Sequence, residues 1–292
     1  MTQIKNKPSV SFPYTKSVLV LYYNKRVLRA AGIEAPPATW DAFLQQCRQI
    51  KERTGKHAIS IDVDCSTISG MIFSMGGVII EDGISQYDSP ESVRVFTLIE
   101  TLFKEKLAFQ NPPRTFNDET AFSNDEIAFL LRTSAQYSYL ENLMEDHDNW
   151  GIAPIPQADL DNPGTVLSGG NLTIFNTTQE QQRTAWAFIR YFTSPEISAR
   201  WALGTGYLPV RLSAAQHPDM QAFWAQWPDN RVAFDCLIFA HPEPNLAGWQ
   251  EIRGLVENAE TEVITGLKSG EQAARDLKEK ADRILAQSRR ID

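Results

Sequence analysis

Asp62 and Asp64 are the one pair of acidic residues in the sequence whose spacing suggests chemistry. They lie at the end of segment 57–63, whose composition predicts a β-strand. If the strand continues, residues two apart project from the same face. Two neighbouring carboxylates could hold a divalent cation with a nucleotide-sugar, or act as a glycosidase pair. Strand-end carboxylates that lie in solvent, or accept hydrogen bonds from sugar hydroxyls, have the same spacing, so the motif leaves these interpretations open.

Trp249 and Arg253 form a second candidate pair. Trp249 follows the loop HPEPNLAG and begins a predicted helix, and Arg253 falls one turn later on the same face. An aromatic ring covers apolar C–H groups of a ligand, while a guanidinium donates two parallel hydrogen bonds. The pair therefore suits a polar, hydroxylated or anionic small ligand. A core tryptophan beside a salt-bridged arginine fits the spacing equally well.

No other motif indicates a catalytic, cofactor or metal site. The sequence lacks the P-loop, dinucleotide-binding, zincin, nucleophile-elbow and EF-hand patterns. The four histidines and three cysteines are scattered, without the spacing of a metal site or a disulfide framework: His57, His147, His217, His241, Cys47, Cys65 and Cys236. Apart from the acidic pair, we predict no catalytic residue, no metal and no cofactor.

The charge and hydropathy of the chain exclude two classes of partner. A formal net charge of −8 argues against nucleic-acid binding, which needs clustered positive charge. The longest apolar run, Val18–Tyr23, is far shorter than the roughly 20 residues that cross a bilayer. The start, MTQIKNKPSV, lacks the apolar core of a signal peptide. The first 33 residues contain no acidic side chain, and we interpret their basic residues as a solvated surface: Lys5, Lys7, Lys16, Lys25, Arg26 and Arg29.

Strand-like and helix-like segments alternate along the chain, which predicts an α/β protein with mainly parallel sheets. Ligand-binding loops then lie at the carboxyl ends of strands. The Pro-rich stretch Pro154–Pro163 is the best internal boundary. The predicted strands are 18–23, 57–63, 127–131, 151–155 and 166–175. The predicted helices are 25–31, 40–54, 90–107, 178–192, 195–204 and 269–289.

Several segments resemble a known family, in the same order along essentially the whole chain. They are SVLVLYYNKRVLRAAGIEAPPATWDAF (17–43), SGGNLTIF (168–175), AWAFIRYFTSPEISARWALGTGYLPVR (185–211) and QEIRG (250–254). These runs resemble the extracellular solute-binding proteins of bacterial ABC importers, in the group that includes maltose-binding and glycerol-3-phosphate-binding proteins.

The resemblance implies a periplasmic-binding-protein type II-like α/β fold, in which two lobes joined by crossing strands close on a solute by a hinge motion. We expect a second, C-terminal lobe from 22–160 plus 208–292, and the crossing strand with a remnant of the first lobe from 1–21 plus 161–207. Family members begin with a secretion signal and several strand–helix units, on the order of 100 residues, before the first crossing strand. The resemblance thus implies that the signal peptide and part of the first lobe are missing, so that the first lobe is incomplete.

The resemblance also implies ligand-binding residues. Five positions carry over from the glycerol-3-phosphate-binding branch, with a threonine in place of its serine at one of them: Ser17, Thr133, Gly170, Tyr207 and Arg253. We add three further candidates: Trp249, Asn171 and Asp64. The tryptophans that the family has near 62–66 are replaced by DVDCS, which favours a hydroxyl-rich sugar over a glycerol phosphodiester.

We therefore expect a binding module and not an enzyme: the solute-binding component of an ABC importer, which captures a sugar, polyol or glycerol-phosphate-type solute. Its partners would be the permease transmembrane subunits, and its location periplasmic or extracellular and membrane-anchored, as a lipoprotein. Because an incomplete lobe leaves apolar edges unpaired, a dimer or a complementing N-terminal fragment is also expected. The alternatives are a metal-dependent glycosyltransferase-like enzyme using Asp62 and Asp64, and an interaction fragment that binds no solute.

Overall fold

The computed structural model describes residues 11–112, 115–144 and 146–288, and strand β2 (Ser17–Asn24) lies at its centre. The sequence predicts a strand over 18–23, and the structure confirms it with one more residue at each end. All of its residues except Tyr23 are buried. The basic residues Lys5 and Lys7, and the helix end predicted at Arg289, lie outside the described residues.

The main sheet has the order β11-β9-β2-β7-β3-β6, and β8 also pairs with β2. Strand β2 is antiparallel to β7, β8 and β9, with β8 and β9 following each other along one edge of it. The parallel pairs in the described sheet are β3 with β6, β3 with β7 and β9 with β11. Because the antiparallel pairs of β2 are equally numerous, the expectation of mainly parallel sheets is wrong. These strands are β3 (Ile59–Ile61), β6 (Ala108–Gln110), β7 (Phe129–Thr133), β8 (Trp150–Pro154), β9 (Thr165–Ser168) and β11 (Ala240–Pro242).

Two short ribbons and the helices complete the fold. The ribbons are β1 (Phe12–Pro13) with β10 (Asn171–Leu172), and β4 (Ile80–Glu81) with β5 (Ile84–Ser85). The α-helices are α1 (Lys25–Ala30), α2 (Trp40–Thr54), α3 (Cys65–Ser74), α4 (Pro90–Lys104), α5 (Asn117–Ser123), α6 (Tyr137–Leu143), α7 (Gln179–Phe192), α8 (Pro195–Thr205), α9 (Leu212–Ala215), α10 (Pro218–Gln226), α11 (Asp229–Asp235), α12 (Trp249–Ile264) and α13 (Gly270–Ser288). The 3-10 helices are η1 (Ser134–Gln136), η2 (His147–Asn149) and η3 (Cys236–Phe239).

Local signals explain most helix ends. Thr39 caps α2 by accepting a hydrogen bond from the backbone N–H of Ala42, and Gly55 ends the helix in the left-handed conformation, as predicted. Helix α8 continues past Gly204, where we expected its end, and stops at Gly206, whose φ is 74°. The strand predicted over 166–175 is interrupted at Gly169, whose φ of 100° separates β9 from β10.

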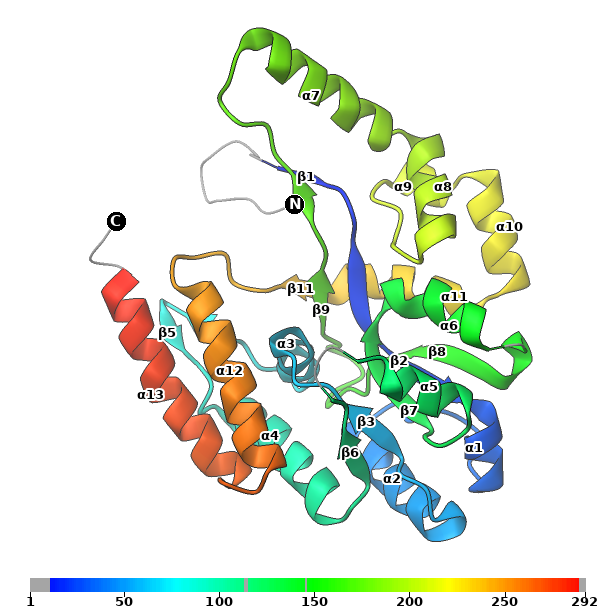
Figure 1. The fold of residues 1–292 in the computed structure, drawn as a ribbon, viewed down its shortest axis with the longest axis vertical. Helices are drawn as coiled ribbons and strands as arrows, with labels where there is room; N and C mark the ends of the chain where they lie inside the picture. The colour runs from blue at the N-terminus through cyan, green and yellow to red at the C-terminus, as the bar shows by residue number, and fades with distance from the viewer. Residues whose placement is uncertain (1–10, 113–114, 145, 289–292) are drawn as a thin grey trace.

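The alternating side chains of β2 contribute to two hydrophobic cores. Leu19 and Leu21 belong to the larger core, which α2, α3, α4, α12 and α13 cover. Val18, Val20 and Tyr22 point to the opposite face and pack with residues of α5, α6 and α11. In Figure 1, α3, α4, α12 and α13 lie to the left of β2, α5, α6 and α11 lie to its right, and α2 lies below it.

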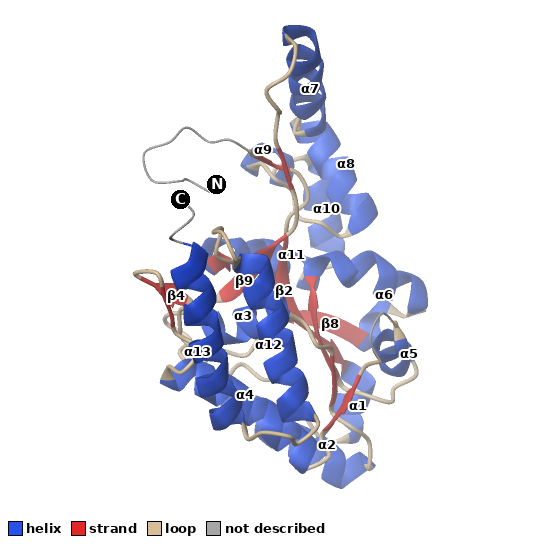
Figure 2. Ribbon diagram, turned by 60° about the vertical axis from the view of Figure 1, so that its left-hand side comes forward, coloured by secondary structure: helices blue, strands red, loops and turns tan. Residues whose placement is uncertain are grey.

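Three chain segments meet at what we call the junction: Thr15, Lys16, Gly169, Gly170 and Leu208. The N–H of Leu208 donates to the carbonyl of Lys16 at 2.7 Å, and the N–H of Gly170 donates to the Thr15 hydroxyl at 3.1 Å. A Cβ atom on Gly169 would lie 2.0 Å from the Thr15 carbonyl oxygen. Beyond the junction, the β1–β10 ribbon and α7 extend away from the main sheet (Figures 1 and 2).

Candidate functional site

Four of the predicted ligand-binding residues gather around the start of β2. Ser17 is the first residue of the strand and is paired with Ser168 on β9. Thr133 ends β7 and faces Leu19 of β2. Gly170 belongs to the junction, and Tyr207 directly precedes its Leu208. The structure therefore brings together Ser17, Thr133, Gly170 and Tyr207, which are up to 190 positions apart in the sequence.

A groove of about 590 Å³ opens beside the junction. Its polar lining residues come from four separate parts of the chain: Ser11, Lys16, Ser66, Ser168, Asn171, Glu243 and Asn245. Asn171 is the one predicted ligand residue among those that line it. Ser17 and Gly170 are next to lining residues in the sequence, and Arg253 contacts two of them, but Tyr207 lines a separate small cavity with Ser134 and Leu208. The groove offers amide, hydroxyl, ammonium and carboxylate groups, so it can both donate and accept hydrogen bonds.

Lys16 connects the groove to the junction. Its ammonium donates a hydrogen bond to the carbonyl of Gly169 at 3.0 Å, and burial lowers the pKa of this lysine below its usual value. Sequence reasoning placed Lys16 only in a basic surface. Its position directly before Ser17 is the one signal that could have marked it as part of the site.

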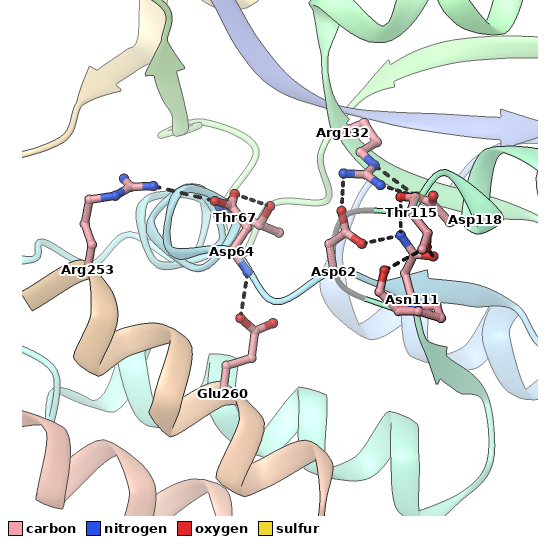
Figure 3. A network of polar contacts seen from close by, with 10 residues as sticks. Asp62, Asp64, Thr67, Asn111, Thr115, Asp118, Arg132, Arg253 and Glu260 are labelled. Carbon is pink, nitrogen blue, oxygen red and sulfur yellow. Dashed lines mark hydrogen bonds and ion pairs between the residues drawn. The ribbon is translucent and has the colours of Figure 1, made fainter. Parts of the chain in front are cut away.

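Arg253 reaches the groove through its partners. Its guanidinium donates to the Ser66 hydroxyl at 3.1 Å and forms an ion pair with Glu243, and both of these residues line the groove. Asp64 lies 3.6 Å from the same guanidinium (Figure 3). Burial alone lowers the pKa of Arg253, but its neighbours Cys65, Glu243 and Asp64, of which the last two are carboxylates, outweigh it and raise that pKa. The positive charge of Arg253 is thus already matched by two carboxylates.

Among the described residues, the ring of Trp249 and the guanidinium of Arg253 make no cation–π contact. Trp249 is the first residue of α12, after Gly248 with a φ of 82°, and its ring packs against the larger core. Arg253 is salt-bridged. This arrangement is the second interpretation that the spacing allowed.

The acidic pair does not share a strand face, because the strand does not continue through it. Strand β3 ends at Ile61, and the carboxylates of Asp62 and Asp64 point apart (Figure 3). Asp64 caps α3, where it accepts hydrogen bonds from the backbone N–H and the hydroxyl of Thr67 at 2.8 and 3.0 Å. Asp62 forms an ion pair with Arg132. Among the residues that the structure describes, no group of three or more His, Cys, Asp or Glu side chains could hold a metal ion.

Arg132 anchors a buried acidic cluster that the sequence analysis missed. It donates to the carboxylate of Asp118 at 2.6 and 2.9 Å. The neighbouring Glu119 is fully buried, and neither of its carboxylate oxygens has a hydrogen-bond partner in the described structure. Burial, followed by the charge of Asp118, raises the pKa of Glu119 to about 7. Glu119 is therefore a buried group that titrates near neutral pH.

None of the helices in the described part of the chain has the length and apolar character that crossing a membrane requires.

Comparisons with known proteins agree with this architecture. The family model described as "Bacterial extracellular solute-binding protein" matches residues 2–231. The sn-glycerol-3-phosphate-binding periplasmic protein UgpB of Escherichia coli O6:K15:H31 is 27% identical to the chain, over 94% of the chain and 67% of UgpB.

Two solved structures share the fold. UgpB from Mycobacterium tuberculosis, in complex with glycerophosphocholine, aligns with a TM-score of 0.85 at 20% identity, over 97% of this chain and 72% of its own. The sugar-binding protein MalE from Xanthomonas citri aligns with a TM-score of 0.85 at 23% identity, over 96% and 72%. These matches confirm the predicted type II periplasmic-binding-protein fold. By its family match over most of its length, the chain belongs to the bacterial extracellular solute-binding proteins.

Proposed function

We propose that the chain is the solute-binding component of an ABC importer and that it holds its solute in the groove beside the junction. The observation that carries this proposal is the groove itself, whose polar side chains converge from four parts of the chain beside the point where three segments meet. The protein would act in the periplasm or at the outer face of the membrane, and would deliver the solute to the transmembrane subunits of the permease.

The groove chemistry favours a neutral, hydroxyl-rich solute such as a sugar or polyol. Arg253 is already paired with Glu243 and Asp64, so an anionic solute would have to compete with two carboxylates for it. Asn171, Asn245 and Ser66 can exchange hydrogen bonds with hydroxyl groups without such competition. Glycerol phosphates are the less favoured class, although one relative is named for glycerol 3-phosphate.

The junction would act as the hinge of this binding protein. In this proposal, residues 22–160 and 208–292 form one lobe, and 1–21 and 161–207 form the crossing strand and part of the other. Hydrogen bonds at Lys16, Gly170 and Leu208 hold the crossing segments together. A rotation of one lobe against the other would therefore change the geometry of these hydrogen bonds. Lys16 belongs both to this hinge and to the groove, and thereby couples solute contact to hinge geometry.

A further polypeptide would cover the outer face of α7. This helix exposes three large apolar side chains, those of Trp186, Phe188 and Tyr191. Phe175, which precedes the helix, is 78% exposed. The relatives are longer than the region they share with this chain, which supports a complementing segment as the covering polypeptide.

Isothermal titration calorimetry of the chain tests the proposed function. The titrants are maltose, glycerol, glycerol 3-phosphate, glycerophosphocholine and UDP-glucose with Mn²⁺. We expect saturable heat from a neutral sugar or polyol, and a roughly fivefold loss of affinity in Asn171→Ala and Asn245→Ala, since each removes about one hydrogen bond. Asn142→Ala, an exposed amide on α6, is the matched control.

Two outcomes would contradict the proposal. Heat only from UDP-glucose with Mn²⁺ would favour an enzyme, and no heat from any titrant would favour an interaction fragment.

A further inference from the structure

Residues 62–64 connect the buried acidic cluster to the wall of the groove (Figure 3). At one end of this segment, the carboxylate of Asp62 forms an ion pair with Arg132. At the other end, Asp64 caps α3, and the second residue of that helix, Ser66, lines the groove. A displacement of the segment would therefore move part of the groove wall.

The groove end of the segment is bonded to several neighbours. The backbone N–H of Asp64 donates to the side chain of Glu260 at 3.1 Å, and its carboxylate accepts from the backbone N–H of Thr67 at 2.8 Å. The same carboxylate lies 3.6 Å from the guanidinium of Arg253, which donates to the Ser66 hydroxyl at 3.1 Å. A shift of Asp64 is thus passed on to Ser66 and Arg253 through direct contacts.

At the cluster end of the segment, one guanidinium serves two carboxylates. Arg132 is paired with Asp62 and donates to Asp118 at 2.6 and 2.9 Å. Both carboxyl oxygens of the buried Glu119, and one oxygen of Asp118, have no hydrogen-bond partner in the described structure. The charges of Asp118, Arg132 and Asp62 all act on the carboxyl group of Glu119. The guanidinium of Arg132 is therefore already engaged before Glu119 ionises.

Two other cations near α5 are engaged elsewhere. In the turn after that helix, Arg26 pairs with the carboxylate of Asp125, and Lys56 donates to the carbonyl of the same residue at 2.6 Å. Within the described structure, Arg132 is the cation whose charge acts on Glu119. The titratable side chains nearby on β2, α6 and η2 are also bonded, to one another or to backbone carbonyls: Tyr22, Tyr137, Glu141 and His147.

We propose that segment 62–64 and the acidic cluster form a pH-sensitive switch that alters the groove wall when Glu119 ionises. While Glu119 is protonated, Arg132 stays bonded to Asp62 and Asp118. Once Glu119 is ionised, a third carboxylate competes for the same guanidinium, so Asp62 is held less strongly and the start of α3 shifts. Because burial raises the pKa of Glu119 to about 7, the change falls near neutral pH. Its effect on a solute rests on the proposed function, whereas the change in the wall does not.

Backbone nuclear magnetic resonance of the unliganded chain tests this switch. The full chain, labelled with ¹⁵N, is titrated from about pH 5.5 to about pH 8.5, a range that brackets neutral pH. The amide resonance of Thr120, next to Glu119 on α5, reports the ionisation. The amide resonance of Thr67, which donates to Asp64, reports the groove end. We expect both resonances to shift with a common midpoint near pH 7.

Variants separate the ionisation from its transmission. Glu119→Gln should remove the pH-dependent shift of both amides. Asp62→Asn should keep the shift at Thr120 and abolish it at Thr67, because its ion pair with the cluster is lost. The control is Glu126→Gln, which replaces an exposed carboxylate in the turn after α5 and should keep both shifts. Spectra of the variants that match wild type at the acidic end of the titration show that the fold is intact.

Three results would overturn the proposal. The first is that Thr120 shows no midpoint near neutral pH, so that Glu119 does not ionise there. The second is that Thr120 shifts and Thr67 does not in the wild-type chain, so that the effect of the charge stays local. The third is that Thr67 titrates equally in Glu119→Gln, which would assign the change to another group such as a histidine. Because no solute is present, failure of the switch and failure of the proposed function can be told apart.

Discussion

The guanidinium group of Arg253 on α12 is paired with the carboxylate of Glu243 in the wall of the groove. The Ser66 hydroxyl accepts from the same guanidinium at 3.1 Å, and Asp64 lies 3.6 Å from it. An arginine held in this way acts mainly to position its partners, because a buried ion pair offsets much of its own charge. In the proposed function, recognition of the solute would then rest on neutral groups of the groove.

Replacing Glu243 by Gln should release Arg253 for anions. We expect the affinity for glycerol 3-phosphate to rise about tenfold, or about 1.4 kcal/mol, because a charge-assisted hydrogen bond becomes available. Affinity for a neutral sugar should change much less. Calorimetry with both titrants measures this change. The control is Glu251→Gln, which replaces an exposed carboxylate on α12, the helix that carries Arg253. Unchanged glycerol 3-phosphate affinity would show that Arg253 does not reach the solute.

Gly169→Ala should destabilise the junction. The substituted Cβ would lie 2.0 Å from the Thr15 carbonyl oxygen, at a φ of 100° that side chains rarely adopt. We expect a loss of at least about 1–3 kcal/mol in the free energy of unfolding, measured by urea titration. Gly204→Ala is the matched control, because its Cβ would meet no atom within 4 Å inside α8. That variant should gain about 0.5–1 kcal/mol. Equal stability of the two variants would contradict the close approach at Gly169.

Glu119→Gln should make stability less dependent on pH. The folded-state pKa of Glu119 is about 7, above its ordinary value of 4.5, so the folded state holds this proton more tightly than the unfolded state. The wild-type chain therefore loses stability as pH rises from about 4.5 to 7. The variant should be about 1–3 kcal/mol more stable than wild type at pH 8 and nearly equal at pH 4.5.

Urea titrations at the two pH values measure this difference. Glu126→Gln replaces an exposed glutamate next to the same region and serves as control. A constant difference between Glu119→Gln and wild type at both pH values would contradict the assignment.

Asp64→Ala should affect stability and not turnover. The substitution removes the acceptor for the backbone N–H of Thr67 at the start of α3, and the loss of such a cap costs about 1 kcal/mol. Asp64→Ser should recover part of this, because a serine hydroxyl also caps helices. Urea titration gives the stabilities, and an assay with UDP-glucose and Mn²⁺ should detect no product with any of the three proteins. Product formation by wild type that is lost in Asp64→Ala would restore the enzyme hypothesis.

The apolar face of α7 should make the isolated chain associate. Without a covering polypeptide, its exposed rings are free to contact other copies, so the average mass in light scattering should rise with concentration. Phe188→Ser together with Tyr191→Ser should reduce this rise. Phe116→Ser, an equally exposed ring near α5, should not. A constant monomer mass for wild type would argue that this face needs no cover.

The elements with strong local signals could be predicted from the sequence. Helix α2 begins after Thr39 and ends before Gly55, and β2 is a continuous apolar run. Helix α3 was missed because its residues, Cys65–Ser74, are buried on nearly every side. A helix without a polar face lacks the 3.6-residue period by which a surface helix is found.

The groove could be predicted only in part. The family resemblance led to Ser17, Gly170 and Tyr207, which cluster at the junction. Lys16, Ser66 and Glu243 carry no local pattern, because they meet only through the pairing of β2 with β9, the pairing of β9 with β11 and the packing of α3 against β9. The spacing of Asp62 and Asp64 is a local pattern, but it does not place the two carboxylates on one face. Helix α3 begins directly after Asp64, and the carboxylate of Asp64 caps that helix.

The junction also provides the protein with an intrinsic optical reporter. Tyr14, directly before Thr15, lies 5.9 Å from the indole of Trp201 and 4.4 Å from the ring of Phe192. Trp201 is on α8, which leads to the junction through Tyr207 and Leu208. Tyr14 and Trp201 both belong to the part formed by 1–21 and 161–207, so a rotation of the two proposed lobes leaves the distance between them unchanged. The emission of Trp201 therefore reports whether the N-terminal segment stays packed on α8, and it does so without an added label.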